Sequence, residues 1–359
     1  MRIAVNGATG YTGKLVAAEL ARLGIKSVLV GRDEERLRQA RREAGATDAD
    51  IRLADIAAPA ALAAAFDGCD AVVNCAGPFT ALGEPVIRAA LAAGCHYVDT
   101  AGEQRYVLSV FELFADEARR AGVTVVPAMA DDGGPGDFIG HLTGQAVAPV
   151  ERLILGLWYR DGEASRGSLR SMLALLDDKA LAYRNGGWEP SMTPSVDAMR
   201  FPGAADPVPM ATIGIPPIAT IPRHVEVAHA EGLVSAELVV GLRAVTPELL
   251  ATVPTGPPPD QRRLQRWTHV AEAVGADGRT ARGEVEGADG YGLTAVIAVE
   301  AARRLIADGA PSGVLAPSQA FDPADFLDRL APHGVTWRVG EARGELSTSD
   351  RLFTGLGSA

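Results

Sequence analysis

The chain opens on Arg2-Ile3-Ala4-Val5-Asn6 and continues as Gly7-Ala8-Thr9-Gly10-Tyr11-Thr12-Gly13-Lys14-Leu15-Val16. An apolar strand therefore runs into a turn with glycine at every third position and then into an amphipathic helix. Glycine lets the chain turn tightly and lets a pyrophosphate approach the main chain, while the new helix offers unpaired N–H groups and the positive end of its dipole. This context predicts a dinucleotide-binding site, although a G-x-x-G-x-x-G turn could also serve only to connect strand and helix. The residues expected to bind the cofactor here are Gly7, Thr9, Gly10, Tyr11, Thr12 and Gly13.

The size and composition of the chain bound its class. Its 359 residues suggest about two domains. Hydrophobic residues make up 47% and charged residues 22% of the chain, which is typical of a soluble globular protein. The net charge of -11 argues against nucleic acid as a partner, because nucleic acid selects clustered basic residues. No apolar run is long enough to span a membrane and no signal-peptide pattern precedes the first strand, so neither is expected.

The cysteines and histidines indicate neither a disulfide framework nor a metal site. Cys69, Cys75 and Cys95 are odd in number and clustered, which suggests reduced thiols in a cytoplasmic protein. The six histidines show no C-x-x-C or H-x-x-x-H spacing, so no metal ligand set is expected.

Residues 1–130 alternate between short apolar strands and amphipathic helices. Strands are expected at 2–6, 27–30, 51–54, 71–75, 96–99 and 123–127, and helices at 14–23, 34–43, 59–66, 85–93 and 107–121. Such alternation predicts an α/β fold in which a doubly wound parallel sheet forms a Rossmann domain. Right-handed crossovers would bring the carboxyl ends of all these strands to one edge.

The pattern changes after residue 130. Residues 131–290 are expected to form an α+β substrate or dimerisation domain with a mainly antiparallel sheet. Its strands are predicted at 152–159, 223–228 and 235–240, with a hairpin of 267–274 and 280–286 and a helix at 168–182. The stretch 186–222, rich in Pro, Gly and Met, is expected to be a long loop of the kind that often acts as a lid. Residues 291–340, the C-terminal helices and strand, are expected to return to the Rossmann domain, and 341–359 to form a tail.

The residues after the second and third strands distinguish NADP from NAD. NAD sites place a carboxylate on the ribose 2′-OH, whereas NADP sites place an arginine near the 2′-phosphate. Here the second strand ends in Gly31-Arg32-Asp33. We expect Gly31 and Arg32 to bind NADP(H), since Asp33 is better explained as the N-cap of the next helix. Asp55, just past the third strand, could accept a hydrogen bond from the adenine amino group or could be a plain turn residue.

A second glycine-containing loop follows the fourth strand. It reads Asn74-Cys75-Ala76-Gly77-Pro78 and lies beside the expected topological switch point. Its small residues would let the nicotinamide ribose approach the backbone, so Cys75, Ala76, Gly77 and Pro78 are candidate cofactor contacts. The dipeptide Gly77-Pro78 could instead be only a loop break.

Several blocks of the sequence together carry a family likeness. They are Asn6-Gly7-Ala8-Thr9-Gly10-Tyr11-Thr12-Gly13, Asn74-Cys75-Ala76-Gly77-Pro78-Phe79, Gly83-Glu84-Pro85-Val86 and His96-Tyr97-Val98-Asp99-Thr100-Ala101-Gly102-Glu103, with Gly290-Tyr291-Gly292-Leu293-Thr294-Ala295 and Gly313-Val314-Leu315-Ala316-Pro317 near the C-terminus. In these blocks the chain resembles the saccharopine dehydrogenase-like oxidoreductases, most of all the bacterial branch that includes trans-acting enoyl reductases. The resemblance implies an NADP-dependent reductase with a Rossmann domain and an α/β second domain, often a homodimer.

One loop departs from that family pattern. Members of the branch usually carry a Gly-Phe-Asp-x-x-Pro-x-Asp-type segment after the sixth strand, whereas this chain has Ala130-Asp131-Asp132-Gly133-Gly134-Pro135-Gly136-Asp137. Because the loop borders the expected substrate cleft, the resemblance carries over neither lysine metabolism nor lipid enoyl reduction.

Few side chains qualify as proton donors for hydride transfer, in which the cofactor supplies the chemistry and the protein supplies position. No lysine follows a tyrosine in the Tyr-x-x-x-Lys spacing of short-chain dehydrogenases. The catalytic candidates are Asp99 at the end of the fifth strand, Tyr97 on the same face, and Tyr291 at a helix start. Each also has a structural explanation, as a loop cap, a core residue and a packing residue respectively. Other options are Glu103, Asp132 and Asp137, of which Asp137 is better explained as a helix N-cap.

Two functional hypotheses follow. The first is an NADP-dependent oxidoreductase that transfers hydride to a C=C or C=N bond, or a C=O bond, of a small-molecule substrate. The second is an NADP(H)-binding sensor that kept the fold and lost the chemistry, since fold alone does not decide function. The second domain and its long loop favour an enzyme with a substrate pocket.

Overall fold

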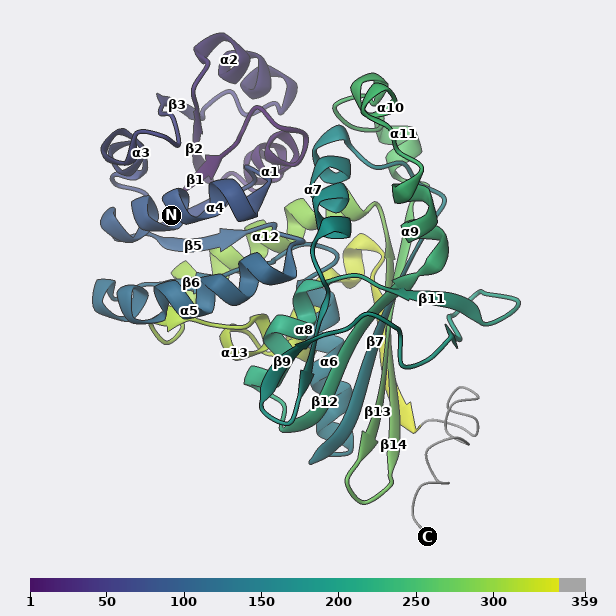
Figure 1. The fold of residues 1–359 in the computed structure, drawn as a ribbon. Helices are drawn as coiled ribbons and strands as arrows, with labels where there is room; N and C mark the ends of the chain where they lie inside the picture. Colours follow the sequence, from purple (N-terminus) through teal and green to yellow (C-terminus); the bar gives the residue numbers. More distant parts are fainter. Residues whose placement is uncertain (342–359) are drawn as a thin grey trace, which may run out of the picture.

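Two β-sheets with helices packed around them make up residues 1–341, the part of the chain that the computed structural model describes (Figure 1). The side chains of Asp177 and Glu341 are also outside that description. The predicted tail, apart from the backbone of Glu341, lies outside the described residues.

The first sheet is entirely parallel, in the order β15-β6-β5-β4-β1-β2-β3. Its strands are β1 Arg2–Asn6, β2 Lys26–Gly31, β3 Asp50–Leu53, β4 Ala71–Asn74, β5 His96–Asp99, β6 Thr124–Val126 and β15 Gly313–Val314. One face carries α1 Tyr11–Arg22, α2 Glu34–Glu43 and α12 Gly290–Ala307; the other carries α3 Pro59–Phe66, α4 Phe79–Ala92 and α5 Gln104–Ala121. The predicted doubly wound Rossmann sheet is confirmed.

The second sheet is mixed but mostly antiparallel, in the order β10-β11-β12-β7-β13-β14-β16. Its strands are β7 Val150–Arg160, β10 Ala198–Met199, β11 Val208–Thr212, β12 Val227–Ser235, β13 Arg266–Gly275, β14 Thr280–Ala288 and β16 Thr336–Glu341, with a side hairpin of β8 Leu181–Arg184 and β9 Gly187–Pro190 on β12. The β7–β12 pair is parallel and the other pairs are antiparallel. The predicted α+β character and the hairpin across residues 275–279 are confirmed.

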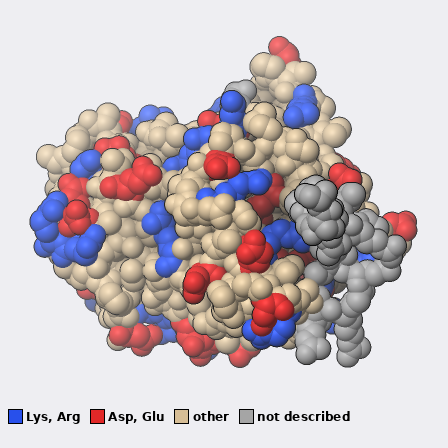
Figure 2. Space-filling model, turned by 60° about the horizontal axis from the view of Figure 1, so that its bottom comes forward, with Lys and Arg blue, Asp and Glu red and all other residues tan. Residues whose placement is uncertain are grey.

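The remaining helices connect and cover the two sheets. They are α6 Gly134–Ala146, α7 Arg166–Asp177, α8 Pro216–Thr220, η1 Ile221–Arg223, α9 Ala236–Arg243, α10 Pro247–Thr252, α11 Pro259–Arg262, α13 Pro317–Ala320, α14 Pro323–Leu330 and η2 Ala331–His333. Within residues 1–341 no helix combines the length and the apolar character that crossing a bilayer requires. On the face drawn in Figure 2, acidic and basic side chains are interspersed.

Three predictions for the second sheet are wrong. A strand was expected at 235–240, but only Ser235, the last residue of β12, is in a strand. Residues 236–240 belong to α9, whose buried positions Val239 and Leu242 lie three residues apart, as on a helix face. The strand expected at 223–228 begins only at 227, after a 3-10 turn that contains Pro222. The expected loop 186–222 contains β9, β10, β11 and α8, whose strands are too short to show a period in the sequence.

The C-terminal part divides between the two sheets. Helix α12 packs on the first sheet as expected, and the short strand β15, which the sequence did not predict, pairs with β6. The final strand does not: β16 pairs with β14 in the second sheet. The expectation for that strand is therefore wrong: β16 pairs with the edge of β14 that β13 leaves open.

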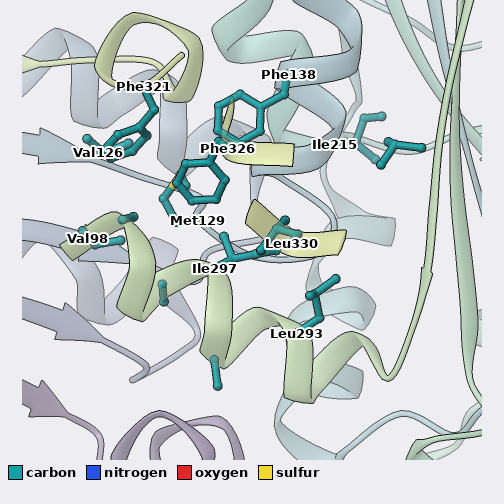
Figure 3. Packing of buried hydrophobic residues seen from close by; sticks show 14 of the residues in the cluster. Val98, Val126, Met129, Phe138, Ile215, Leu293, Ile297, Phe321, Phe326 and Leu330 are labelled. Atoms are coloured by element: carbon teal, nitrogen blue, oxygen red, sulfur yellow. The ribbon is translucent and has the colours of Figure 1, made fainter. Parts of the chain in front are cut away.

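A shared core joins the two sheets. Figure 3 shows Phe138 of α6 and Phe326 of α14 beside Met129 and Ile297, with Val126 of β6 close by. The Phe138 and Phe326 rings lie 4.9 Å apart between centroids, and both side chains are fully buried. This packing of the second domain's helices on the first sheet brings the second domain to the carboxyl edge of the parallel strands.

Candidate functional site

The glycine turn has the tight geometry that a dinucleotide requires. Gly7 adopts φ +75° and Gly10 N donates to Gly7 O at 2.9 Å. A Cβ on Gly13 would lie 2.3 Å from Gly7 O, so only glycine fits there. Helix α1 begins at Tyr11 with no side-chain cap on its first N–H groups, which leaves them directed at the turn.

The loop after β4 lies directly against this turn. A Cβ on Gly7 would come 2.9 Å from Ala76 N. Asn74 accepts from Asn6 Nδ2 at 2.9 Å and from Ala76 N at 3.1 Å, so a buried amide pair holds the two loops together. The structure thus brings the predicted segments 7–13 and 75–78 to one place. Sequence reasoning assigned no role to Asn6, whose position at the end of β1 was the available signal.

The two loops expected to face the adenosine half of the cofactor follow β2 and β3, which are neighbouring strands of the first sheet. Asp33 Oδ1 accepts from Arg36 N at 3.0 Å and caps α2, as predicted. Arg32 is exposed, and no ion pair or hydrogen bond engages its side chain within residues 1–341. Asp55 is exposed and accepts from Ala57 N at 2.9 Å, which is a turn geometry that leaves its second oxygen open.

Asp99 and Tyr97 belong to a buried network under the edge of the sheet. Asp99 is fully buried and accepts from Ala101 N at 3.1 Å, Ala128 N at 2.8 Å and Tyr106 Oη at 2.8 Å. Tyr97 Oη lies 3.2 Å from Tyr106 Oη and is also fully buried. Burial raises the pKa of Asp99 to about 6, against the pull of these donors. Neither side chain has exposed surface, so their catalytic roles stay predictions. Their hydrogen bonds hold neighbouring loops and side chains in position.

Tyr291, the third catalytic candidate, meets the glycine turn. Its ring packs edge-to-face on Tyr11, with centroids 5.1 Å apart, and Ser165 N donates to Tyr291 Oη at 2.7 Å. Tyr11 Oη in turn donates to Pro257 O at 2.6 Å. Residues from the start, middle and end of the chain therefore converge at the first turn of α1.

Two segments of the second domain cover this edge of the sheet. We call residues 253–258 the strap; a Cβ on Gly256 would lie 2.2 Å from the Tyr11 ring. Arg166 at the start of α7 donates through Nε to Val253 O at 2.6 Å and so ties α7 to the strap. Figure 1 shows α7 standing between the first domain and α9–α11. The sequence predicted a helix at 168–182, which overlaps α7, but it assigned neither α7 nor the strap to the site, since neither carries a motif.

Three carboxyl groups gather beneath α7. Glu103 accepts from Phe79 N and from Gly102 N, each at 3.0 Å, and Asp131 accepts from Tyr159 Oη and Thr294 Oγ1, each at 2.9 Å. Burial raises the pKa of all three, and for Asp132 the negative neighbours Asp131 and Glu103 raise it further, well above its usual range. Asp132 has the most strongly raised pKa of the three, and it keeps some exposed surface, as Asp131 does.

Asp137 has a different place from the one expected. It lies inside the first turn of α6, whose N-cap is Gly133, so the N-cap prediction is wrong. Its buried carboxylate lies 2.9 Å from His224 Nε2 and accepts from Ser318 N at 2.8 Å, while His224 Nδ1 lies 2.9 Å from His141 Nδ1. Burial alone would raise the pKa of Asp137, but His224, Ser318 and Thr220 outweigh burial and lower it. These contacts join α6, η1 and α13, and they are structural.

The cofactor that this fold implies fits the residues present. The turn has no room for a Cβ at Gly7 or Gly13, the α1 N–H groups have no side-chain cap, and the Arg32 side chain is free in the described chain. Those are the features that a phosphorylated dinucleotide uses. Within residues 1–341 no group of three or more His, Cys, Asp or Glu side chains could hold a metal ion.

Comparison with known proteins agrees with this geometry. The family described as saccharopine dehydrogenase NADP binding domain matches residues 3–126. A trans-acting enoyl reductase of Mycobacterium tuberculosis (strain ATCC 25618 / H37Rv) is 35% identical over 140 residues, covering 38% of this chain and 34% of that protein. A trans-acting enoyl reductase of Mycobacterium ulcerans (strain Agy99) is 28% identical over 228 residues, covering 62% of this chain and 50% of that protein. The matches therefore span about a third to a half of these curated relatives.

A solved structure shares the whole architecture. Apo histidine-tagged saccharopine dehydrogenase (L-Glu forming) from Saccharomyces cerevisiae aligns with a TM-score of 0.61 at 15% identity, over 95% of this chain and 99% of that chain. That identity shows the fold alone. The family match and the mycobacterial relatives confirm the resemblance to the saccharopine dehydrogenase-like oxidoreductases over the first domain, and the description of the matched family indicates NADP(H) as the cofactor of that domain.

Proposed function

We propose that this protein is an NADP(H)-dependent reductase that acts on a C=C or C=N bond, or a C=O bond, of a small molecule. The observation that carries the proposal is the glycine turn at residues 7–13, which has dinucleotide geometry and lies within the matched NADP-binding segment. The mycobacterial relatives are named enoyl reductases, which favours a C=C bond. When bound, the nicotinamide supplies the hydride.

The residues of this chain then bind and orient the reactants. Gly7, Gly10 and Gly13 admit the pyrophosphate, and the loop 75–78 admits the nicotinamide ribose. The strap and α7 exclude water from the covered edge, which strengthens electrostatic interactions there. Asp132, with its raised pKa and residual exposure, supports a role as the proton source, whereas Asp99 and Tyr97 hold the loop beneath it. A homodimer and a cytoplasmic location stay predictions.

Two measurements test the proposal. NADPH should bind to the purified chain with quenching of protein fluorescence, and its absorbance at 340 nm should fall when conjugated enoyl, imine or carbonyl compounds are added. Binding without oxidation by any of these would support the sensor instead. Absence of binding would remove the proposal.

Arg32→Ala should weaken NADPH about tenfold or more and NADH much less. A charge-assisted hydrogen bond to the 2′-phosphate contributes about 1.5–3 kcal/mol, and NADH lacks that phosphate. Fluorescence titration with both nucleotides measures the difference. Arg120→Ala, an exposed arginine on α5, is the matched control and should leave both affinities unchanged. Equal losses for NADPH and NADH in Arg32→Ala would remove the role of Arg32.

Gly256→Ala should speed the release of NADPH several-fold. The added Cβ would lie 2.2 Å from the Tyr11 ring, so the strap must move off the glycine turn. Stopped-flow displacement of bound NADPH measures the rate. Gly241→Ala on α9, where an added Cβ meets nothing within 4 Å, should leave the rate as it is. An unchanged rate in Gly256→Ala would mean that the strap does not retain the nucleotide.

A further inference from the structure

A hollow of about 470 Å³ lies away from the glycine turn, where both domains meet. Its walls include Phe111 of α5, Tyr183 and Trp188 of the β8–β9 hairpin, Pro222 and Arg223 of η1, and Gln319 of α13. In Figure 1 the elements α5, α8, α13 and β9 surround this region, and α5 contacts β15 and α8. None of the residues of the proposed cofactor site lines it.

Arg223 is the charged group of the hollow. Its guanidinium lies 3.7 Å from the centroid of the Phe111 ring, and its Nε donates to Ala219 O at 3.0 Å. Within residues 1–341 no carboxylate oxygen comes within ion-pair distance of it, and no acidic residue lines the hollow. Glu112 on α5 acts on Arg223 electrostatically from beyond that distance, so the half-buried cation lacks an ion-pair partner. Its two terminal NH₂ groups are left for a ligand. The hollow therefore favours an anion.

The side walls favour a flat ligand. Tyr183 and Trp188 pack edge-to-face with centroids 5.1 Å apart, and both are half-buried. Phe111 also lines the hollow, and Arg223 stacks on its ring. Aromatic side chains arranged in this way stack on planar apolar groups.

The hairpin that carries the two aromatic side chains is held in place from α5. Gln104 Nε2 donates to Leu181 O at 2.8 Å, and Leu181 N donates to Gln104 Oε1 at 2.9 Å. Gln319, which also lines the hollow, donates through Nε2 to Arg223 O at 3.1 Å. Separate hydrogen bonds therefore position the aromatic hairpin and the Arg223 cation, as in a preformed binding site.

We propose that this hollow binds a small aromatic carboxylate. The carboxylate pairs with the two terminal NH₂ groups of Arg223, a bidentate geometry that arginine suits. The aromatic ring of the ligand lies against Tyr183 and Trp188. This site is separate from the reductase site, and its occupation does not depend on NADP(H).

The probe that tests the proposal is 2-naphthoate, with 2-naphthamide as its uncharged match. In isothermal titration without nucleotide, 2-naphthoate should bind at one site and 2-naphthamide at least tenfold more weakly. Arg223→Gln should weaken 2-naphthoate at least tenfold, and Trp188→Leu should weaken both compounds. Arg120→Gln, an exposed arginine near the end of α5, should change neither.

Because Arg223 also packs on Phe111, the melting temperature of each variant is measured by circular dichroism to check that it folds. If Arg223→Gln does not fold, the comparison of the two probes on the wild type and on Trp188→Leu decides. Equal binding of 2-naphthoate and 2-naphthamide, equal binding by Arg223→Gln and wild type, or no binding at millimolar concentration would each overturn the proposal.

Discussion

Gly13→Ala is expected to reduce NADPH affinity by at least tenfold, a loss of about 1.4 kcal/mol. The new Cβ would lie 2.3 Å from Gly7 O and 2.9 Å from the Ala8 Cα, both of which are backbone atoms. The turn must therefore open, which moves the N–H groups of α1 away from the pyrophosphate. Fluorescence titration with NADPH measures the loss.

The control for this substitution is Gly241→Ala. It adds the same methyl group to a helix, α9, where an added Cβ has no neighbour within 4 Å, so NADPH affinity should be unchanged. Circular dichroism of both variants separates a local change from unfolding. If Gly13→Ala binds NADPH as tightly as the wild type while folded, the glycine turn is not the pyrophosphate site.

Asp137→Asn is expected to lower the free energy of unfolding by about 1.5–3 kcal/mol at pH 7, the range for losing hydrogen bonds to a charged group. The carboxylate of Asp137 is fully buried and is engaged by His224 and Ser318, which belong to separate elements. An amide offers one acceptor oxygen instead of two and carries no charge. Urea unfolding measures the change, with the exposed Asp48→Asn as a control that should leave the midpoint in place.

The same carboxylate predicts a pH dependence. The pKa of Asp137 is lower in the folded chain than in the unfolded chain, so its contribution is present above the unfolded value and lost as pH falls through the folded value. The stability gap between wild type and Asp137→Asn should therefore narrow as the pH falls below about 4. A gap that stays constant to the acid limit would contradict the assignment.

The first sheet could be predicted from the sequence because its signals are local. Each strand is a short apolar run, and a glycine or a cap such as Asp33 marks where the next element begins. The second sheet was predicted only in part. Residues 235–240 show a pattern that is compatible with both strand and helix, and tertiary packing makes most of them a helix. Strand β16 pairs with β14 through contacts between residues that are distant in the sequence.

The candidate site shows the same division. The residues of the glycine turn, the loop 75–78 and Asp33 lie where their motifs placed them, because a strand–turn–helix unit determines its own geometry. The surroundings of Asp99, with Tyr106 and Ala128 as donors, depend on how β5, α5 and the loop after β6 pack. The strap over Tyr11 joins residues 246 positions apart, which no local pattern encodes.

The strand β15 has a consequence for how the chain is made. Gly313 and Val314 supply the last strand of a sheet whose other strands all lie before residue 127, and α12 covers one face of that sheet. A fragment ending near residue 130 would leave β6 as an open edge and expose the apolar surface under α12. Both features favour aggregation. During synthesis residues 313 and 314 must leave the ribosome before the nucleotide-binding sheet is complete, so that sheet needs protection until then.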